Sequence, residues 1–266
     1  MLAPKKSLGQ HFLHDENIAR KIVEALPVGA PIVEIGPGQG ALTKHLTGHG
    51  RTVVGIEIDK RAIALLRERF QDSVTFVSGD ILKVDFHEIR EHQGAKLVVV
   101  GNIPYYITSE ILFRLFEFHP DITSATLMMQ MEVAKRLVAE RGTRQTKDYG
   151  ILSVFTRFYS LPQLLFKVSR NSFTPKPNVD SAVIRLEFKE RLPDCDRRLF
   201  TNVVRATFGQ RRKTIRNGLR SMGVADAQLD TLDFDLTKRP ENLDVDDFLR
   251  LTASLMPYRG HFSLRF

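Results

Sequence analysis

The chain has 266 residues, 42% of them hydrophobic and 26% charged, which excludes a disordered chain and provides enough apolar material for one α/β domain plus a smaller one. Lys and Arg outnumber Asp and Glu by 39 to 31, and the formal charge of +8 favours a polyanionic partner. The single cysteine, Cys195, excludes an intramolecular disulfide and a cysteine-based metal cluster. We therefore expect a cytoplasmic protein; no signal peptide and no membrane span of ~20 apolar residues is recognisable.

Short apolar runs alternate with helical patterns over the first two thirds of the chain. Residues 15–26 and 60–70 repeat apolar side chains at helical spacing. Runs that predict strands lie at 31–35, 52–58, 74–78, 96–101, 125–129, 164–168 and 182–188, with a helix at 151–158. Alternation of this kind predicts an α/β fold with a mostly parallel sheet of about seven strands and crossover helices.

Strand signals stop near residue 188, and the remaining sequence is helical. Its helices are interrupted by Gly or Pro at residues 193, 209, 223, 240 and 257. The sequence therefore predicts two domains, 1–189 and 190–266. Charge in the second is uneven, because residues 194–223 carry 8 Lys or Arg against 2 Asp or Glu, and residues 224–250 carry 3 against 8.

A glycine-rich turn, Glu34-Ile-Gly-Pro-Gly-Gln-Gly40, follows the first of the consecutive strands and leads toward a helix. Glycines there let the backbone approach a ligand closely. With Ala41 the turn also fits the dinucleotide pattern, so the glycines alone do not separate NAD from S-adenosylmethionine.

Two carboxylates follow the next two strands at their carboxyl ends. Glu57 lies 21 residues after Gly36, a spacing that suits a carboxylate bound to both ribose hydroxyls of a nucleoside. Asp80 is placed to accept a hydrogen bond from the adenine amine of the cofactor, while the Ile81 backbone completes the contact with the base edge. Together the two acids indicate one nucleoside site.

The motif Asn102-Ile-Pro-Tyr105 follows the fourth strand and carries the chemistry. An adenine exocyclic amine is a poor nucleophile, because its lone pair is delocalised into the ring. An Asn oxygen and a backbone carbonyl that accept both N–H bonds favour the pyramidal nitrogen that attacks a sulfonium methyl, and no metal is needed. Pro104 fixes the turn, and Tyr105 offers a face on which a flipped-out base stacks.

These motifs resemble the small-subunit ribosomal RNA adenine N6,N6-dimethyltransferases, which are related to the erythromycin-resistance rRNA methyltransferases. The resemblance covers nearly the whole chain. It rests on Lys6–Leu13, Glu34–Gly40, Glu57–Asp59, Gly79-Asp80, Asn102–Tyr105, Phe173–Ser181 and Gln210–Asn217.

The resemblance implies a class I methyltransferase sheet with a helical C-terminal domain, acting on two adjacent adenosines in the 3′-terminal hairpin loop of small-subunit rRNA, within the RNA or a pre-30S particle. Phe173 is implied to face Tyr105 across the target base. The implied S-adenosylmethionine ligands are His11, Leu13, Gly36, Glu57, Asp80, Ile81 and Asn102. This sequence departs from the family at His11 and Tyr106, where Asn is common, at Glu110, where Pro is common, and at Asn178, where Lys is frequent.

A basic segment follows residue 210. On a helix beginning near Gln210, four cations would share one face, and Ile215, Leu219 and Met222 would lie on an adjacent apolar face. The cations predicted to contact RNA are Arg212, Lys213, Arg216 and Arg220. The stretch 141–147 is a second candidate for RNA contact, and we expect the protein to be a monomer.

Two other functions fit part of the sequence. A nicotinamide-dependent oxidoreductase fits the glycine-rich turn and Glu57, but not Asn102–Tyr105. A non-catalytic RNA-binding assembly factor fits the basic segment, but does not need the Asn102–Tyr105 turn. Within the resembled family, the large-subunit resistance enzymes share the same catalytic motif, and Gln210–Asn217 favours the small-subunit enzymes.

Overall fold

The structure is a computed structural model that describes residues 2–47, 51–141, 148–210 and 212–261. Its contacts divide the chain into two compact units. The first holds residues 1–134 and 159–190, and the second holds residues 135–158 and 191–266. No helix within the described ranges is both long and apolar enough to cross a membrane.

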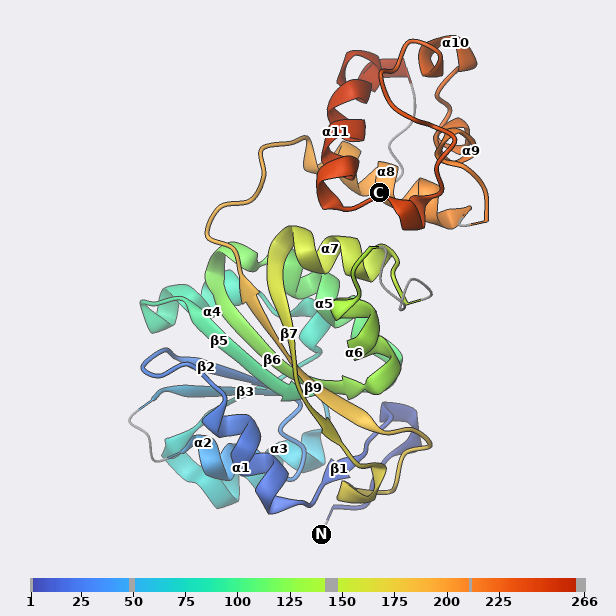
Figure 1. Cartoon of the computed structure of the whole chain (residues 1–266). Coiled ribbons are helices and arrows are strands. Elements are labelled where there is room, and N and C mark those ends of the chain that lie inside the picture. Colours follow the sequence, from blue (N-terminus) through green and yellow to red (C-terminus); the bar gives the residue numbers. More distant parts are fainter. Residues whose placement is uncertain (1, 48–50, 142–147, 211, 262–266) are drawn as a thin grey trace. The chain divides into compact units, whose positions relative to one another are not determined.

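A seven-stranded sheet forms the centre of the first unit, in the order β4-β3-β2-β5-β6-β9-β7 (Figure 1). The first five strands in that order are parallel, and β9 runs antiparallel to both of its neighbours, β6 and β7. The strands are β2 (Ile32–Ile35), β3 (Val53–Glu57), β4 (Thr75–Ser78), β5 (Leu97–Asn102), β6 (Ile122–Gln130), β7 (Ser160–Val168) and β9 (Ser181–Phe188). The mostly parallel sheet of about seven strands is thus confirmed.

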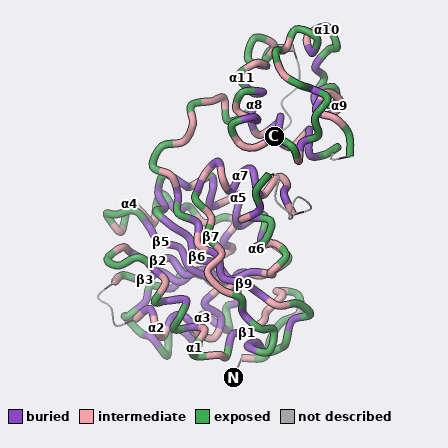
Figure 2. The backbone as a smooth tube through the Cα atoms, in the orientation of Figure 1, coloured by how far each residue is buried: buried purple, intermediate pink, exposed green. Residues whose placement is uncertain are grey.

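Helices of the first unit cover the sheet on both faces (Figure 1). Helices α1 (Glu16–Glu24), α2 (Thr43–Leu46) and α3 (Lys60–Phe70) pack on one face, and α4 (Phe86–Gln93) and α5 (Thr108–Glu117) lie on the other. Central strands are buried on both faces, as Figure 2 shows, and this is why β2 and β5 have continuous apolar runs instead of alternation.

The second unit is helical. Its helices are α8 (Arg197–Gly209), α9 (Ile215–Ser221), α10 (Asp226–Leu229) and α11 (Val245–Leu255), with α6 (Met131–Val138) and α7 (Ile151–Tyr159) contributing residues 135–158. Phe158 stacks on Phe200 with ring centroids 4.6 Å apart, and the Tyr149 hydroxyl donates a hydrogen bond of 2.8 Å to the Leu243 carbonyl. These contacts explain why residues 135–158 group with the helical unit, whereas the sequence predicts a continuous domain over 1–189.

Two differences from the prediction affect the cavity and the basic segment. A two-stranded ladder, β1 (Phe12–Leu13) with β8 (Phe173–Thr174), joins segments 160 residues apart, and no strand was predicted there. Helix α9 begins at Ile215, after the Thr214 N-cap, so the helix predicted from Gln210 is wrong at its start. Its predicted apolar face is confirmed, since Ile215, Leu219 and Met222 are buried.

Candidate active site

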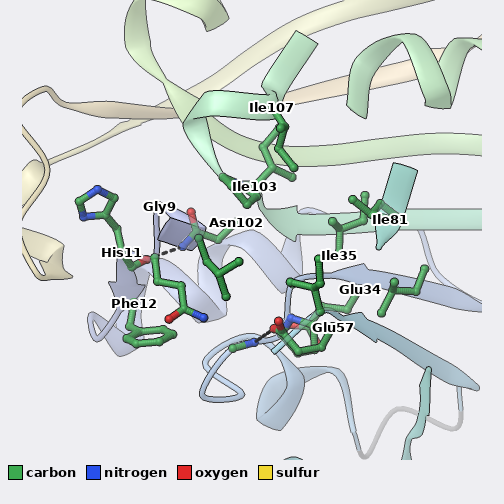
Figure 3. A pocket seen from close by; sticks show the side chains of 18 of the residues that line it. Gly9, His11, Phe12, Glu34, Ile35, Glu57, Ile81, Asn102, Ile103 and Ile107 are labelled. Carbon is green, nitrogen blue, oxygen red and sulfur yellow. Dashed lines mark hydrogen bonds between the residues drawn. The ribbon is translucent and has the colours of Figure 1, made fainter. Parts of the chain in front are cut away.

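A cavity of about 270 Å³ opens at the carboxyl ends of β2, β3, β4 and β5. Its walls come from the segment before β1, the glycine-rich turn and the turns after these strands (Figure 3). Of the residues predicted from the sequence, the cavity brings together His11, Leu13, Gly36, Glu57, Asp80, Ile81, Asn102, Pro104 and Tyr105.

The glycine-rich turn needs its glycines for conformation as well as for space. Gly36 has φ of +64° and Gly38 has φ of +58°, backbone geometry that side chains disfavour. At Gly101, a Cβ would lie 2.7 Å from the Ile35 carbonyl oxygen, because β5 pairs with β2 at that point. Glycine there lets the end of β5 approach β2 and brings Asn102 beside the turn.

Glu57 ends β3 and is 5% exposed. Its two oxygens accept one backbone N–H bond each, from Gly38 at 2.9 Å and from Asp59 at 2.9 Å. Burial raises the pKa of the Glu57 carboxyl, and these backbone bonds oppose that rise. Because an ionised carboxylate has about four acceptor positions, each oxygen keeps one for a ligand in the cavity.

Asp80 and Ile81 line the cavity shortly after the end of β4. The Asp80 side chain caps the short 3-10 helix 81–83 by accepting the Leu82 N–H at 3.0 Å. Ile81 is buried and, with exposed Ile58, gives this end of the cavity apolar walls. A planar base fits between such walls, with an acceptor at its edge.

Asn102 lines the cavity as the last residue of β5. Its side-chain amide nitrogen donates a 2.9 Å hydrogen bond to the backbone carbonyl of His11 (Figure 3). A carbonyl only accepts, so the nitrogen of the amide must face it, and Oδ1 is left as the acceptor for a substrate. The N-terminal segment therefore orients the amide, a contact that the sequence alone did not reveal.

Tyr105 begins the 3-10 helix 105–107, directly after Pro104. Its hydroxyl shares a 2.6 Å hydrogen bond with the hydroxyl of Ser181, a fully buried residue of β9. Burial raises the pKa of the Tyr105 phenol, so it stays neutral at ordinary pH. His11 stacks near its ring, with centroids 5.6 Å apart and an interplanar angle of 24°.

Phe173, which the resemblance implies to face Tyr105, is a buried residue of the short ladder. It lies in β8 opposite Leu13, is 3% exposed and packs in the hydrophobic core. Among the described residues it is not part of the cavity lining, and its role as the ring that faces Tyr105 stays a prediction.

Glu34, the first residue of the glycine-rich turn, was not predicted as a site residue but lines the cavity from β2. It is 1% exposed, and its Oε2 accepts a 2.7 Å hydrogen bond from the Thr43 hydroxyl. Burial raises the pKa of the Glu34 carboxyl to about 7. A glutamate in a buried strand of otherwise apolar residues was the signal that could have identified it.

The four predicted RNA-binding cations lie in the second unit and have two kinds of surroundings. Arg216 binds Asp226 at 3.1 Å and Asp230 at 2.6 Å, and Arg220 binds Asp226 at 2.6 Å. Arg212 and Lys213 are exposed and precede α9, and no carboxylate of the described residues pairs with them. Of the second candidate stretch, residues 142–147 lie outside the described residues.

Comparison with known proteins assigns the chain to a family. The sequence profile described as "Ribosomal RNA adenine dimethylase" matches residues 1–256. The chain belongs to this family. Membership makes it a ribosomal RNA adenine methyltransferase, which excludes a nicotinamide-dependent oxidoreductase.

Two curated relatives cover nearly the whole chain, and both are named "Ribosomal RNA small subunit methyltransferase A". The one from Geobacillus thermodenitrificans is 40% identical over 95% of this chain and 91% of its own length. The one from Bacillus cytotoxicus is 39% identical over 96% of this chain and 92% of its own length.

Two solved structures share the fold. A dimethyladenosine transferase from Plasmodium falciparum is 27% identical, covers 95% of this chain and 99% of its own, and has a TM-score of 0.79. The 23S rRNA methyltransferase ErmE is 29% identical, covers 92% of this chain and 99% of its own, and has a TM-score of 0.66. The expected class I methyltransferase fold is thereby confirmed.

Proposed function

We propose that the chain transfers methyl groups from S-adenosylmethionine to the N6 amines of two adjacent adenosines in the 3′-terminal hairpin loop of small-subunit rRNA, giving N6,N6-dimethyladenosine. The observation that carries the proposal is the oriented Asn102 amide, whose Oδ1 is left for a substrate in the cavity. The small-subunit relatives support the choice of RNA.

The cavity fits S-adenosylmethionine by its own geometry. The buried Glu57 carboxylate keeps one acceptor position per oxygen, which suits two ribose hydroxyls. Asp80 and Ile81 would hold the adenine edge, and the positive φ of Gly36 lets the backbone approach the cofactor. Leu13, buried in β1, closes the cavity on the side of the N-terminal segment.

Two acceptors would hold the target amine. Asn102 Oδ1 is one. The Pro104 carbonyl already accepts bonds of 3.3 Å from the Ile107 N–H and the Thr108 hydroxyl, so we assign the second acceptor to the preceding Ile103 carbonyl. Pro104, with φ of −60°, fixes the turn that presents the Ile103 carbonyl.

S-adenosylmethionine supplies an electrophilic methyl group that is open to in-line attack. As the amine attacks, its nitrogen becomes pyramidal and more positive, and Asn102 Oδ1 and the Ile103 carbonyl stabilise that change more strongly than they stabilise the planar amine. Tyr105 presents its ring for stacking of the flipped adenine, held in place by Ser181. The amine loses one proton for each methyl group that it gains, so two transfers complete the dimethylated base.

Partners and location follow from the proposed substrate. The enzyme would act as a monomer in the cytoplasm on small-subunit rRNA or a pre-30S particle, with the cations around α9 binding RNA phosphates. ErmE, named for its action on 23S rRNA, has the same fold, so methylation of large-subunit rRNA is the second candidate.

The test is transfer of tritiated methyl groups from S-adenosylmethionine to purified ribosomal subunits. Small subunits from a strain lacking the modification should accept close to four methyl groups each, mapped by mass spectrometry to two adjacent adenosines. Small subunits that already carry the modification serve as the control and should accept none. Incorporation into large subunits alone would replace the proposal by the second candidate.

A further inference from the structure

Asp59 is a buried carboxylate that the proposed mechanism does not use. It lies two residues after Glu57, where its Oδ1 caps α3 by accepting the Arg61 N–H at 3.2 Å. It is 2% exposed, and Arg61 compensates its charge with a 2.6 Å ion pair. This pairing holds the pKa of the Asp59 carboxyl well below its usual range. The group is therefore an ionised acceptor at ordinary pH.

The N-terminal segment is bound to this carboxylate. Gln10 Nε2 donates a 3.3 Å hydrogen bond to Asp59 Oδ2, and Lys5 Nζ lies 3.4 Å from Oδ1 as an ion pair. Arg61 also donates a 3.2 Å hydrogen bond to the Ala3 carbonyl. These contacts join residues 49 to 58 positions apart in the sequence. The segment before β1 is thus attached to the start of α3.

The Gln10 amide has a defined orientation. Its Oε1 accepts the Lys5 backbone N–H at 2.8 Å, and a backbone N–H only donates. Its Nε2 faces Asp59, and an ionised carboxylate only accepts. Both contacts require the same orientation of the amide. Gln10 therefore closes residues 5–10 into a loop and binds that loop to Asp59.

His11 is the next residue, and its backbone carbonyl orients the Asn102 amide (Figure 3). This carbonyl lies between two attachments of the chain. The Gln10–Asp59 hydrogen bond precedes it, and the β1–β8 ladder, which begins at Phe12, follows it. Because the peptide unit is planar, the carbonyl turns only when the backbone dihedrals beside it change. The two attachments restrict those dihedrals and so fix the direction of the carbonyl.

We propose that Asp59 is a positioning residue for methyl transfer, which acts through Gln10 to hold the segment whose His11 carbonyl orients the Asn102 amide. This inference rests on the proposed function and concerns the same site. The Asp59 backbone N–H separately donates to Glu57 Oε1 at 2.9 Å, and an Asn at position 59 retains that donor. Changing the Asp59 side chain therefore tests the effect on Asn102 while the backbone contact to Glu57 is kept.

The experiment exchanges donor and acceptor in the Gln10–Asp59 hydrogen bond. Gln10→Glu brings two carboxylates together. Asp59→Asn brings two amide N–H groups together, because its Oδ1 is still needed to cap α3. The double variant Gln10→Glu with Asp59→Asn restores a donor and an acceptor in the reverse direction, keeps an acceptor for the Lys5 N–H and retains the net charge of the wild type. Gln10→Ala removes the hydrogen bond altogether.

Two exposed residues outside the cavity lining provide matched controls. Gln163→Glu in β7 adds the same charge as Gln10→Glu, and Glu68→Gln in α3 removes the same charge as Asp59→Asn. The quantities measured are the single-turnover rate at saturating cofactor and RNA, KM for unmethylated small subunits, and Kd for S-adenosylmethionine. Both controls should match the wild type in all three.

The three single variants at positions 10 and 59 should each lower the single-turnover rate by roughly 10- to 100-fold, up to the cost of misplacing a catalytic group by about 1 Å. The rate should fall by a larger factor than KM for small subunits or Kd for the cofactor rises, since Tyr105 and Glu57 are unchanged. The double variant should be faster than either of its single variants. Such rescue is not expected if each residue only stabilises the fold independently.

The Asn102 side chain gives a second signal that does not depend on activity. In protein labelled with isotopic asparagine, the side-chain amide signal of Asn102 is identified by its absence from Asn102→Ala. The N–H that is bound to the His11 carbonyl should exchange slowly with solvent in the wild type and in the double variant. It should exchange faster in Gln10→Ala.

Three results would overturn the positioning role. A double variant no faster than its slower single variant would show that Gln10 and Asp59 act separately. A wild-type rate in Gln10→Ala at saturating cofactor, with weaker cofactor binding, would make Gln10 a cofactor ligand instead. If Asp59→Asn does not fold, Gln10→Ala decides, and an unchanged rate with unchanged Asn102 exchange rejects the proposal. A wild-type protein that methylates no small subunits would overturn the proposed function, whereas the exchange of the Asn102 amide tests the positioning contact by itself.

Discussion

Asn102 is the residue on which the proposed chemistry depends. Its amide nitrogen is bound to the His11 carbonyl, so Oδ1 acts on the amine as it becomes pyramidal. Asn102→Ala should therefore lower kcat by ~10²–10³, the scale for one preorganised polar partner, with a much smaller effect on RNA affinity. Single-turnover methylation at saturating cofactor measures the rate of the chemical step in the variant and in the wild type. A wild-type rate would remove Asn102 from the mechanism.

Glu57 should contribute to cofactor affinity and not to the chemical step. One charge-assisted bond to the ribose is worth on the order of 1.5–3 kcal/mol, so Glu57→Ala should weaken S-adenosylmethionine binding by at least one to two orders of magnitude. Calorimetric titration provides the dissociation constant. Glu110→Ala, at an exposed position of α5 outside the cavity, is the control and should bind as the wild type does. If Glu57→Ala and Glu110→Ala bind S-adenosylmethionine with equal affinity, the ribose does not bind to Glu57.

Glu34 should make stability depend on pH. Its pKa is raised from 4.5 to about 7 in the fold, so between these values the folded state holds a proton that the unfolded state has lost. Stability therefore falls as pH rises from about 4.5 to 7, by up to about 3 kcal/mol, and is constant above that window as far as this group is concerned.

Substituting Gln for Glu34 should remove this pH dependence, because a Gln oxygen still accepts the Thr43 bond and carries no charge. Urea unfolding at pH 5 and pH 8 measures the free energy of unfolding at each pH. At pH 8 the variant should be more stable relative to the wild type than it is at pH 5. Glu24→Gln, on an exposed face of α1, controls for a general loss of negative charge. If the difference in stability between pH 5 and pH 8 is the same in Glu34→Gln and the wild type, Glu34 is ionised in the fold.

At the scale of elements, the cations around α9 form two pairs with different expected effects. Arg216 and Arg220 are already neutralised by Asp226 and Asp230, whereas Arg212 and Lys213 are exposed before the helix. A cation paired with a carboxylate adds little to phosphate neutralisation, since the acid must first be displaced.

The double change Arg212→Ala with Lys213→Ala should reduce the salt dependence of RNA binding by roughly one to two counterions. The matched double change Arg216→Ala with Arg220→Ala removes the same charge and should alter the slope less. The measurement is the slope of log affinity against log salt for each variant. A larger effect from the second pair would mean that RNA breaks its ion pairs.

Elements with a long repeating pattern were predictable from the sequence, and those that depend on distant partners were not. Helix α3 was predicted at 60–70 and spans Lys60–Phe70, because its apolar spacing and the Asp59 cap are local signals. The two-residue strand β1 has no periodicity of its own, and its partner β8 lies 160 residues away. The α9 ion pairs likewise depend on acids 6 to 14 residues further along the chain, in α10 and at its C-cap.

The same distinction holds within the site. Glu57, Asp80 and Asn102 could be placed together from the sequence, because parallel strands bring their carboxyl ends to one edge of the sheet. The orientation of the Asn102 amide could not be predicted from the sequence, since it is set by a backbone carbonyl 91 residues earlier in the chain. Burial of Phe173 is likewise a consequence of the β1–β8 pairing that the motif does not reveal.

At the scale of the whole molecule, the two units are built from interleaved parts of the sequence. The aromatic core of the helical unit includes Phe155 and Phe158 of α7, which pack on Phe200, and Tyr149, which packs on Phe208. A fragment of residues 190–266 would lack these side chains and expose the rings that they cover. Its core would therefore be smaller than the core of the helical unit in the intact chain, and small domains are marginally stable.

We therefore expect the isolated 190–266 fragment to lack a cooperative fold, although sequence alone marks it as a domain. In the intact chain, Phe158→Ala should destabilise the helical unit by ~3–5 kcal/mol, the usual cost of removing a buried aromatic ring, and Phe158→Leu should cost less. Urea unfolding followed by circular dichroism measures both variants and the fragment. A fragment that unfolds cooperatively with a dispersed amide spectrum would show that residues 135–158 only dock on an independent domain, and Phe158→Ala would then leave the helical unit at nearly wild-type stability.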